Sequence, residues 1–168
     1  MNRIFSQSRS IARVLTLSLV FIASSAAPAR ADITAFLGLS PTPDNHAVKG
    51  FSAGLGLLIV AFEFEYANLS EEILEGLPGL KTYAGNVLLQ TPIEIVGTQF
   101  YGTIGAGGYS ETLGLLEESH VGTNIGGGAK IKLLGPIRVR LDYRVFKLQG
   151  SPIHDVYHRF YVGANLKF

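Results

Sequence analysis

Apolar and polar side chains alternate without a break over the last segment of the chain, residues 158–168. Side chains of a β-strand point to opposite faces with a period of two, so this segment predicts a strand with one apolar face and one polar or small face. The apolar face is formed by Phe160, Val162, Ala164, Leu166 and Phe168, and the other by Arg159, Tyr161, Gly163, Asn165 and Lys167.

The same two-residue period recurs along the preceding sequence and predicts seven more strands. It is clearest in residues 137–147, where one face carries only large apolar residues and the other carries mainly arginine and aspartate. Turn formers such as Pro41–Asn45 and Leu134–Pro136 separate the segments. We expect an all-β chain with strands at about residues 33–39, 49–58, 60–68, 81–91, 99–110, 121–133, 137–147 and 158–168.

The connections between these strands alternate between long and short. Long loops at one end and short turns at the other are typical of transmembrane β-barrels, and strands of about ten residues match a tilted crossing of the apolar layer. An even number of strands lets the sheet close without an unpaired edge in lipid. The pattern predicts an eight-stranded antiparallel up-and-down transmembrane β-barrel. The long breaks are 41–48, 69–80, 111–120 and 148–157, and the mostly shorter ones are 58–60, 92–98 and 134–136.

The start of the chain has the three parts of a secretory signal peptide. Arg3, Arg9 and Arg13 precede an apolar run at residues 14–23, and small residues then lead to Ala29-Arg30-Ala31, a cleavage site of the A-x-A type. The alternative, a membrane anchor, is disfavoured because the run is shorter than the roughly 20 residues that a spanning helix needs. We expect cleavage after Ala31, with residues 1–31 as signal peptide and residues 32–168 as one barrel domain.

The formal net charge of +1 at pH 7 comes from this leader. Its four arginines are the only charges in residues 1–31, and without them ten basic residues face thirteen acidic ones. The net charge of the expected mature chain is therefore −3, which gives no reason to expect nucleic-acid binding. The absence of cysteine excludes disulfides, thiolate metal sites and a cysteine nucleophile.

Large aromatic residues indicate which face meets lipid. Charged faces alone would also suit the outside of a soluble barrel. The opposite faces, however, carry aromatic residues near the strand ends, where a membrane barrel has its aromatic belts. We therefore expect lipid outside and charges inside, with a soluble periplasmic lipid binder of the lipocalin type as the alternative. The aromatic residues are Phe51, Tyr66, Phe100, Phe160 and Phe168.

The expected mature chain resembles the small eight-stranded outer-membrane barrels of the OmpA/OmpX type. Beside the strand architecture, its last segment is similar to the C-terminal assembly signal polar-x-Gly-x-x-apolar-x-apolar, with Tyr161 at the polar position and Gly163, Leu166 and Phe168 at the others. The resemblance implies a place in the bacterial outer membrane and contact with its lipid and lipopolysaccharide. It implies recognition of the segment ending in Phe168 by the barrel-assembly machinery. We expect a monomer, without the further periplasmic peptidoglycan-binding domain of OmpA.

A barrel of eight strands is only just wide enough for its own side chains. Cations inside it would have to be neutralised by Glu63, Glu65 and Asp142, because unpaired buried charge is very costly. We expect a salt-bridge plug; the alternative is a narrow conduit that tolerates anions, since basic residues exceed acidic ones. The basic residues of the polar faces are Lys130, Lys132, Arg138, Arg140, Arg144, Arg159 and Lys167.

Motifs for ligands are weak in this chain. The glycine runs Gly105–Gly108 and Gly126–Gly128 neither open a helix nor continue as the Gly-Lys-Ser/Thr of a P-loop, and glycine within a strand usually marks a bend or close packing. His154 and His158 lack the helical spacing and the number of donors that a metal site needs. We expect no cofactor and no metal.

The loops contain residue types that hydrolases use, but not at the spacing of a nucleophile motif. We therefore expect a structural or interaction role without catalysis, and the alternative is a loop-borne hydrolase, acyltransferase or other lipid-modifying enzyme. The residues considered are Ser110, Glu111, Glu118, His120, Ser151 and His154.

The same loops are acidic and contain leucines. They form either a solvated surface whose leucines pack on the barrel rim or a contact surface for a partner. The acidic residues are Asp44, Glu71, Glu72, Glu75, Glu111, Glu117, Glu118 and Asp155, and the leucines are Leu74, Leu77, Leu113, Leu115 and Leu116.

Overall fold

The computed structural model describes residues 30–42, 45–70, 79–113, 116–150, 152 and 154–168. Arg30 and Ala31, the last two residues of the expected leader, lie at the start of the first strand. Within these ranges no helix is long and apolar enough to cross a membrane. Outside the described residues lie the rest of the expected signal peptide, Asp44, residues 71–78, Leu115, Ser151 and the side chains of Leu113, Leu116 and Glu117.

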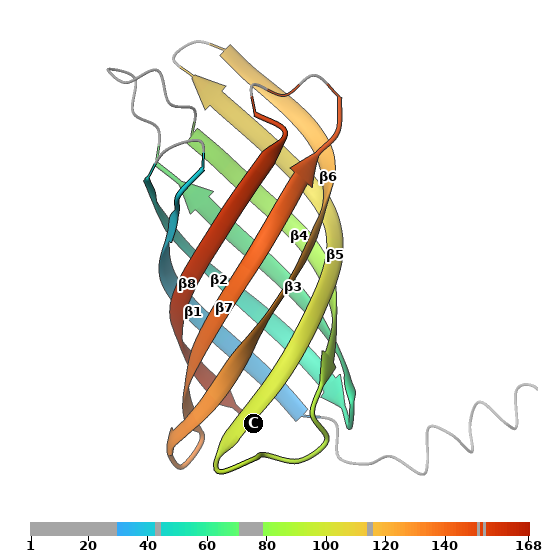
Figure 1. The fold of residues 1–168 in the computed structure, drawn as a ribbon, viewed down its shortest axis with the longest axis vertical. Coiled ribbons are helices and arrows are strands. Elements are labelled where there is room, and N and C mark those ends of the chain that lie inside the picture. The colour runs from blue at the N-terminus through green and yellow to red at the C-terminus, as the bar shows by residue number, and fades with distance from the viewer. Residues whose placement is uncertain (1–29, 43–44, 71–78, 114–115, 151, 153) are drawn as a thin grey trace, which may run out of the picture.

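Eight antiparallel strands form one closed barrel (Figure 1). Each strand pairs with its neighbours in the sequence, and β8 pairs with β1 to close the sheet. The predicted all-β, up-and-down architecture is therefore confirmed. The strands are β1 (Arg30–Ser40), β2 (His46–Leu57), β3 (Val60–Leu69), β4 (Gly79–Gln90), β5 (Thr98–Leu113), β6 (Leu116–Leu134), β7 (Ile137–Leu148) and β8 (Val156–Lys167).

The two ends of the barrel differ in their connections. We call one the turn end: it holds residues 58–59, 91–97 and 135–136 together with the start of β1 and the end of β8. The other is the loop end, where β1, β3, β5 and β7 end and β2, β4, β6 and β8 begin.

The hairpin of β5 and β6 is longer than the sequence predicts. Residues 111–120 were expected as a long loop, but the two strands stay paired as far as Leu113 opposite Leu116, with Glu111 opposite Glu118. Strands that project into water need no apolar face, so backbone pairing continues where the alternation of side chains ends. The predicted strict alternation of long and short connections is wrong for the same reason, because 114–115 is as short as 135–136.

Closure staggers the sheet by almost a whole strand. A path that starts at Arg30 of β1 and crosses from each residue to its paired partner reaches Arg159 of β8. The next residue of β8, Phe160, pairs with Leu39, so the path returns to β1 at its opposite end. Such a stagger requires strands that tilt steeply against the barrel axis, as Figure 1 shows.

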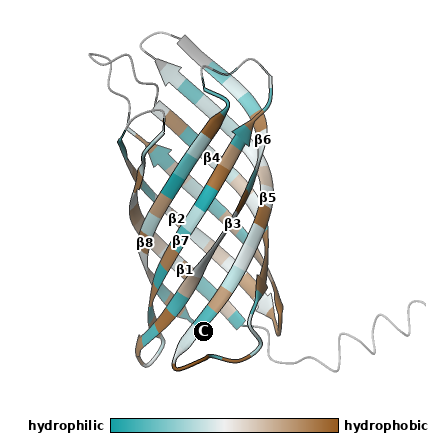
Figure 2. Ribbon diagram, in the orientation of Figure 1, coloured by the Kyte–Doolittle hydropathy of each residue, from teal (hydrophilic) through white to brown (hydrophobic). Residues whose placement is uncertain are grey.

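Apolar residues cover the outside of the barrel and polar residues fill the inside. Hydropathy alternates along the strands in Figure 2. In β7, Leu141 is 42% exposed on the outer face, whereas Arg140 and Arg144 are completely buried on the inner one. The predicted facing is confirmed, and it is the reverse of a soluble lipid-binding barrel, whose interior is apolar.

All five predicted belt residues lie on the outer face, where further aromatic residues join them. Phe51, Tyr66 and Tyr83 are cross-strand partners, with ring centroids 5.6 Å and 5.0 Å apart. On the opposite wall the ring of Tyr143 stacks on Phe160 at 4.4 Å. Tilted and stacked rings of this kind form a belt toward the loop end.

Candidate functional site

The lumen is the candidate site, and its first layer lies near the turn end. The half-buried carboxylate of Asp32 forms ion pairs with Lys130 and with Arg138, the latter at 3.2 Å. The Arg138 Nε donates to Asn165 Oδ1 (2.7 Å) and its Nη1 to Gln99 Oε1 (3.2 Å). A cavity of about 20 Å³ lies among these side chains, which is room for about one water molecule.

The second layer is built around Arg140 and Arg144. Arg140 contacts Glu63 through both terminal nitrogens and Asp142 at 3.0 Å. Arg144 contacts the same two carboxylates, at 2.8 Å and 2.9 Å. All four charges are buried, and each has at least two partners, as a buried ionic network requires.

Two tyrosines extend this network. The hydroxyl of Tyr101 donates to Asp142 and accepts from the Arg140 Nε at 2.7 Å. Tyr161 donates to the same aspartate at 3.0 Å. The lumenal faces of β5 and β8 therefore supply neutral donors that satisfy the remaining lone pairs of Asp142.

A third layer contains Glu65 between two guanidinium groups. Glu65 pairs with Arg144 at 3.1 Å and with Arg159. The Arg159 guanidinium also lies over the ring of Phe146, with 4.2 Å to the centroid, and over Phe36 at 5.6 Å. Cation–π contact of this kind joins the charged layers to the apolar residues above them.

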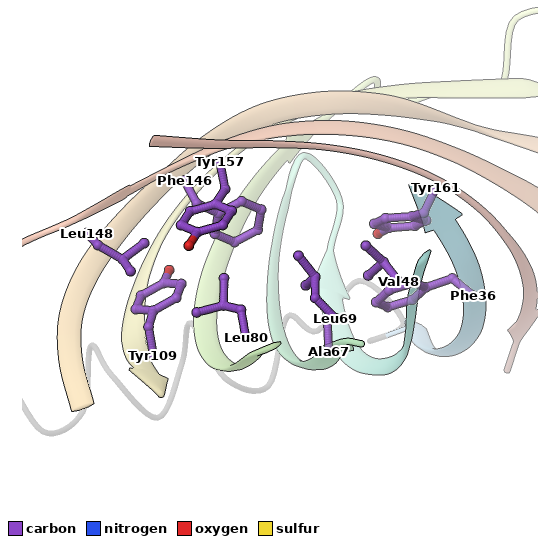
Figure 3. Packing of buried hydrophobic residues seen from close by; sticks show 10 residues of the cluster. All are labelled: Phe36, Val48, Ala67, Leu69, Leu80, Tyr109, Phe146, Leu148, Tyr157 and Tyr161. Atoms are coloured by element: carbon purple, nitrogen blue, oxygen red, sulfur yellow. The ribbon is translucent and has the colours of Figure 1, made fainter. Parts of the chain in front are cut away.

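An apolar layer lies inside the barrel on the loop side of the charges, and Figure 3 shows how its side chains pack. Its side chains come from all around the barrel and are buried inside it. The sequence analysis missed this layer, although these residues share the inward parity of the charged ones. The layer consists of Phe36, Val48, Ala67, Leu69, Leu80, Tyr109, Phe146, Leu148, Tyr157 and Tyr161.

Some of the residues considered as catalytic come together at the loop end. The His120 Nε2 lies 3.5 Å from carboxylate oxygens of both Glu111 and Glu118, and Tyr157 donates to Glu111 at 2.6 Å. Glu111 is buried on the inner face of β5, so its neighbour Ser110 faces the opposite side of the wall.

The two histidines considered for a metal have different partners. The His154 ring packs edge-on against Tyr157, with centroids 6.3 Å apart. The His158 Nδ1 is hydrogen bonded to the Tyr143 hydroxyl at 2.7 Å. The two rings therefore have a packing and a hydrogen-bonding role, respectively, near the start of β8.

The glycine runs make room for lumenal side chains. A Cβ atom on Gly128 would lie 2.5 Å from the Tyr101 hydroxyl, and one on Gly105 would lie 2.0 Å from the Asn86 Oδ1. Asn86 accepts from Asn124 across this gap, at 3.0 Å. These glycines allow close packing within the barrel, as glycine in a strand usually does.

Two of the predicted basic residues lie at the turn end rather than in the network. Lys132 is exposed next to a register irregularity between residues 132 and 134. Lys167 donates to Glu94 at 3.1 Å and holds the pKa of that carboxyl below its ordinary value. The network itself contains an acid that the sequence analysis left out, Asp32, which shares the inward parity of Thr34 and Phe36.

Comparison with solved structures identifies the fold. The barrel is similar to the N-terminal β-barrel domain of Pseudomonas aeruginosa OprF, with a TM-score of 0.64, 15% identity, and 83% of this chain and 97% of that chain covered. It is similar to Neisserial surface protein A, with a TM-score of 0.58, 12% identity, and 83% of this chain and 94% of that chain covered. It is also similar to Ail, the attachment invasion locus protein of Yersinia pestis, with a TM-score of 0.51, 15% identity, and 83% of this chain and 97% of that chain covered. No family model and no curated protein sequence matches the chain.

Proposed function

We propose, from the fold that this chain shares with small eight-stranded outer-membrane barrels, that it is an outer-membrane protein with a structural or interaction role and no catalysis. The orientation of the side chains is the observation that supports this proposal: an apolar outer surface with aromatic belts surrounds a buried ionic network. Only a barrel in lipid leaves so much apolar surface outside while charges fill its interior.

A closed lumen is part of this proposal. Three charged layers and one apolar layer lie in series along the barrel, which supports a plug over a narrow conduit. An excess of cations would favour anions along an open path, but the described lumenal side chains carry no such excess. Five cations face five carboxylates. The cations are Lys130, Arg138, Arg140, Arg144 and Arg159, and the carboxylates are Asp32, Glu63, Glu65, Glu111 and Asp142.

The interaction surface that we propose is the loop end. The β5–β6 hairpin projects there beyond the neighbouring strands (Figure 1). The exposed side chains of Glu118, in the hairpin, and of Asp155, before β8, add negative charge to the loop end. Of the similar structures, Ail is named as an attachment protein and NspA as a surface protein. A solvated hairpin at the loop end of this barrel suits contact with a partner outside the cell.

The remaining proposals concern assembly and partners. We expect a monomer that contacts outer-membrane lipid and lipopolysaccharide, and whose segment ending in Phe168 is recognised by the barrel-assembly machinery. Leu166 and Phe168 are exposed on the lipid side of β8 and at its end, where such recognition has access to them. The expected cleavage after Ala31 would leave Asp32, a member of the ionic network, as the first residue of the mature chain.

Membrane fractionation tests the proposal. The protein expressed at native level should sediment with the outer membrane, resist extraction by alkaline carbonate and dissolve only in detergent. Recovery in the soluble periplasmic fraction would contradict it and would restore the lipid-carrier alternative. Incubation of the reconstituted barrel with outer-membrane lipids, followed by mass spectrometry, should show no modified lipid; a product that disappears in His120→Ala would show catalysis at the loop end.

A further inference from the structure

We propose that the outer wall formed by β8 and β1–β4 carries a binding site for one phosphorylated glycolipid of the outer leaflet, with its phosphate at Lys49 and Lys81. This inference rests on the proposed function, because it takes the loop end to face the cell exterior. It goes further in naming a site, the residues that form it and the part of the lipid that each residue contacts.

The first observation is a row of polar side chains facing lipid. Lys49, Asn68 and Lys81 are consecutive cross-strand partners on β2, β3 and β4, and both lysines are exposed on the outer face. Adjacent strands lie about 4.8 Å apart, so the two lysine backbones are roughly 10 Å apart, with an amide between them. Long lysine side chains at this spacing can reach a single phosphate from both sides.

The position of this row is the second observation. Lys49 and Lys81 each lie two residues beyond an aromatic partner, Phe51 and Tyr83, in the direction of the loop end. Aromatic belts mark the border between hydrocarbon and headgroups. The lysines therefore lie where lipid phosphates lie, just outside the apolar layer.

Charge gives the third observation. Within the described part of the chain, neither ammonium has an ion pair, whereas the lumenal cations are all paired. Among the described strand side chains that face outward, lysine occurs at three positions near the loop end and neither aspartate nor glutamate occurs. The third position is Lys147, on β7 across the barrel. The described side chains of this wall supply no matching anion, whereas the phosphates of lipid headgroups would.

A groove that begins at Lys49 and Asn68 and extends over β1 and β8 supplies room for an acyl chain. It has a volume of about 800 Å³ and lies between two cross-strand rows. The upper row ends in Lys49 and Asn68, and the lower one contains the small residues Ala35 and Ala164, which create the hollow. This volume is within the roughly 300–1,000 Å³ of ordinary ligand sites. The upper row is Val162, Leu37, Lys49 and Asn68, and the lower row is Ala164, Ala35, Phe51 and Tyr66.

The combination favours a phosphorylated glycolipid over a free anion. Inorganic phosphate would leave the groove empty, and an uncharged lipid would leave the lysines without a partner. A lipid with a phosphate in its headgroup and an acyl chain beside it satisfies both ends of the site at once. The outer leaflet of the expected compartment supplies such a lipid as lipopolysaccharide, whose phosphates are carried on a sugar.

The test compares lipid binding in matched variants of the folded barrel. Native mass spectrometry in nanodiscs measures retention of lipid A, of enzymatically dephosphorylated lipid A and of phosphatidylglycerol. We expect wild type to retain lipid A best, and Lys49→Gln with Lys81→Gln to weaken that retention about tenfold, as two exposed ion pairs allow. The charge-preserving pair Lys49→Arg with Lys81→Arg should bind like wild type, and Lys147→Gln should too.

A second pair of variants tests the groove. Ala35→Phe fills it and should reduce retention of lipid A, whereas Ala53→Phe, an equally exposed alanine of the lipid-facing surface outside the groove, should not. Each variant is first checked for refolding by circular dichroism.

Three results would overturn the inference. Equal loss in Lys147→Gln would mean unspecific charge attraction. Equal retention of phosphatidylglycerol would mean a phosphate site that does not recognise the glycolipid. Unchanged lipid A retention in the double glutamine variant would mean no site at these lysines. In each case the barrel could still fractionate with the outer membrane, so failure of this inference and failure of the proposed function are distinguishable.

Discussion

Single residues of the lumen have more partners than a simple ion pair provides. Asp142 accepts hydrogen bonds from two arginines and two tyrosines. A carboxylate so surrounded is stabilised as an anion, but removing any one donor leaves buried charge without compensation. Residues of the outer wall have no such partners, so substitutions on the two faces of one strand should have unlike effects.

Adjacent residues of β7 test this difference. Leu141→Arg places a cation in the hydrocarbon layer and should lower the free energy of unfolding by about 2–4 kcal/mol. Arg140→Lys keeps the lumenal charge and loses the two-pronged contact with Glu63, for an expected loss of about 1–2 kcal/mol. Urea unfolding from lipid vesicles measures both, with Leu141→Ile as control. A smaller loss for Leu141→Arg than for Arg140→Lys would mean that the assigned faces are reversed.

Parity along the strands predicted which residues are lumenal, but the partners of each could not be read from the sequence. The facing of Arg140, Arg144 and Glu63 follows from alternation alone. Which of these side chains form ion pairs depends on the stagger of the closed sheet. The stagger decides which residues of strands that are distant in the sequence lie at the same level along the barrel axis. Asp32 was missed because it was treated as the first residue after a cleavage site rather than as part of a strand.

At the scale of elements, strands were predictable where lipid enforces a two-faced pattern. Beyond the membrane that constraint ends, and the outer part of the β5–β6 hairpin carries polar residues on both faces, such as Glu111 on the inner face and its neighbour Ser110 on the outer one. The side-chain pattern therefore predicts a loop where the backbone continues to pair.

The apolar lumenal layer could not be predicted for a related reason. Residues such as Leu80 and Leu148 point inward as the alternation requires, but they are apolar where the inner face was expected to be polar.

The ends of the hairpins make the orientation testable. A protease site inserted between residues 114 and 115 should be cut in intact cells, because the loop end is expected to face outward. The same site inserted after Gly135 should be cut only after the outer membrane is permeabilised. Protection of the first site and cleavage of the second in intact cells would mean that the barrel is inserted the other way round.

Phe168, the residue that follows strand β8, should contribute to assembly. Phe168 is 70% exposed, and its backbone N–H donates to the Ala31 carbonyl at 2.8 Å. Its deletion should reduce insertion in cells several-fold, about threefold or more, while refolding into detergent micelles stays largely intact, since an exposed side chain adds little to stability. Phe160→Ala, on the same face of β8, is the control. Normal insertion without Phe168 would refute its role as a signal.

Taken as a whole, the molecule has two kinds of lumenal layer in series inside one wall. The ionic layers occupy the lumen from Asp32 to Glu65, and the apolar layer of Figure 3 lies beyond them. An ion would have to break the first and then cross a segment that resists wetting. The lumen should therefore stay closed even when one barrier is weakened.

Conductance across planar bilayers measures this closure. The wild-type barrel should show no steady current at neutral pH, and Glu63→Ala combined with Arg140→Ala should remain closed because the apolar layer is intact. Stepwise, anion-selective currents in the wild type would favour the conduit instead. Circular dichroism of the double variant guards against a current that arises from misfolding.

The pairing of β1 with β8 closes the sheet, so we expect the barrel to unfold as one unit. To leave the sheet at this seam, the chain must expose two unpaired backbone edges, and in hydrocarbon each unpaired group costs several kcal/mol. Because no single strand can leave the sheet without this cost, we expect the barrel to persist through a high barrier to unfolding. Its turnover in the cell should then begin where a protease can reach the chain outside the hydrocarbon layer.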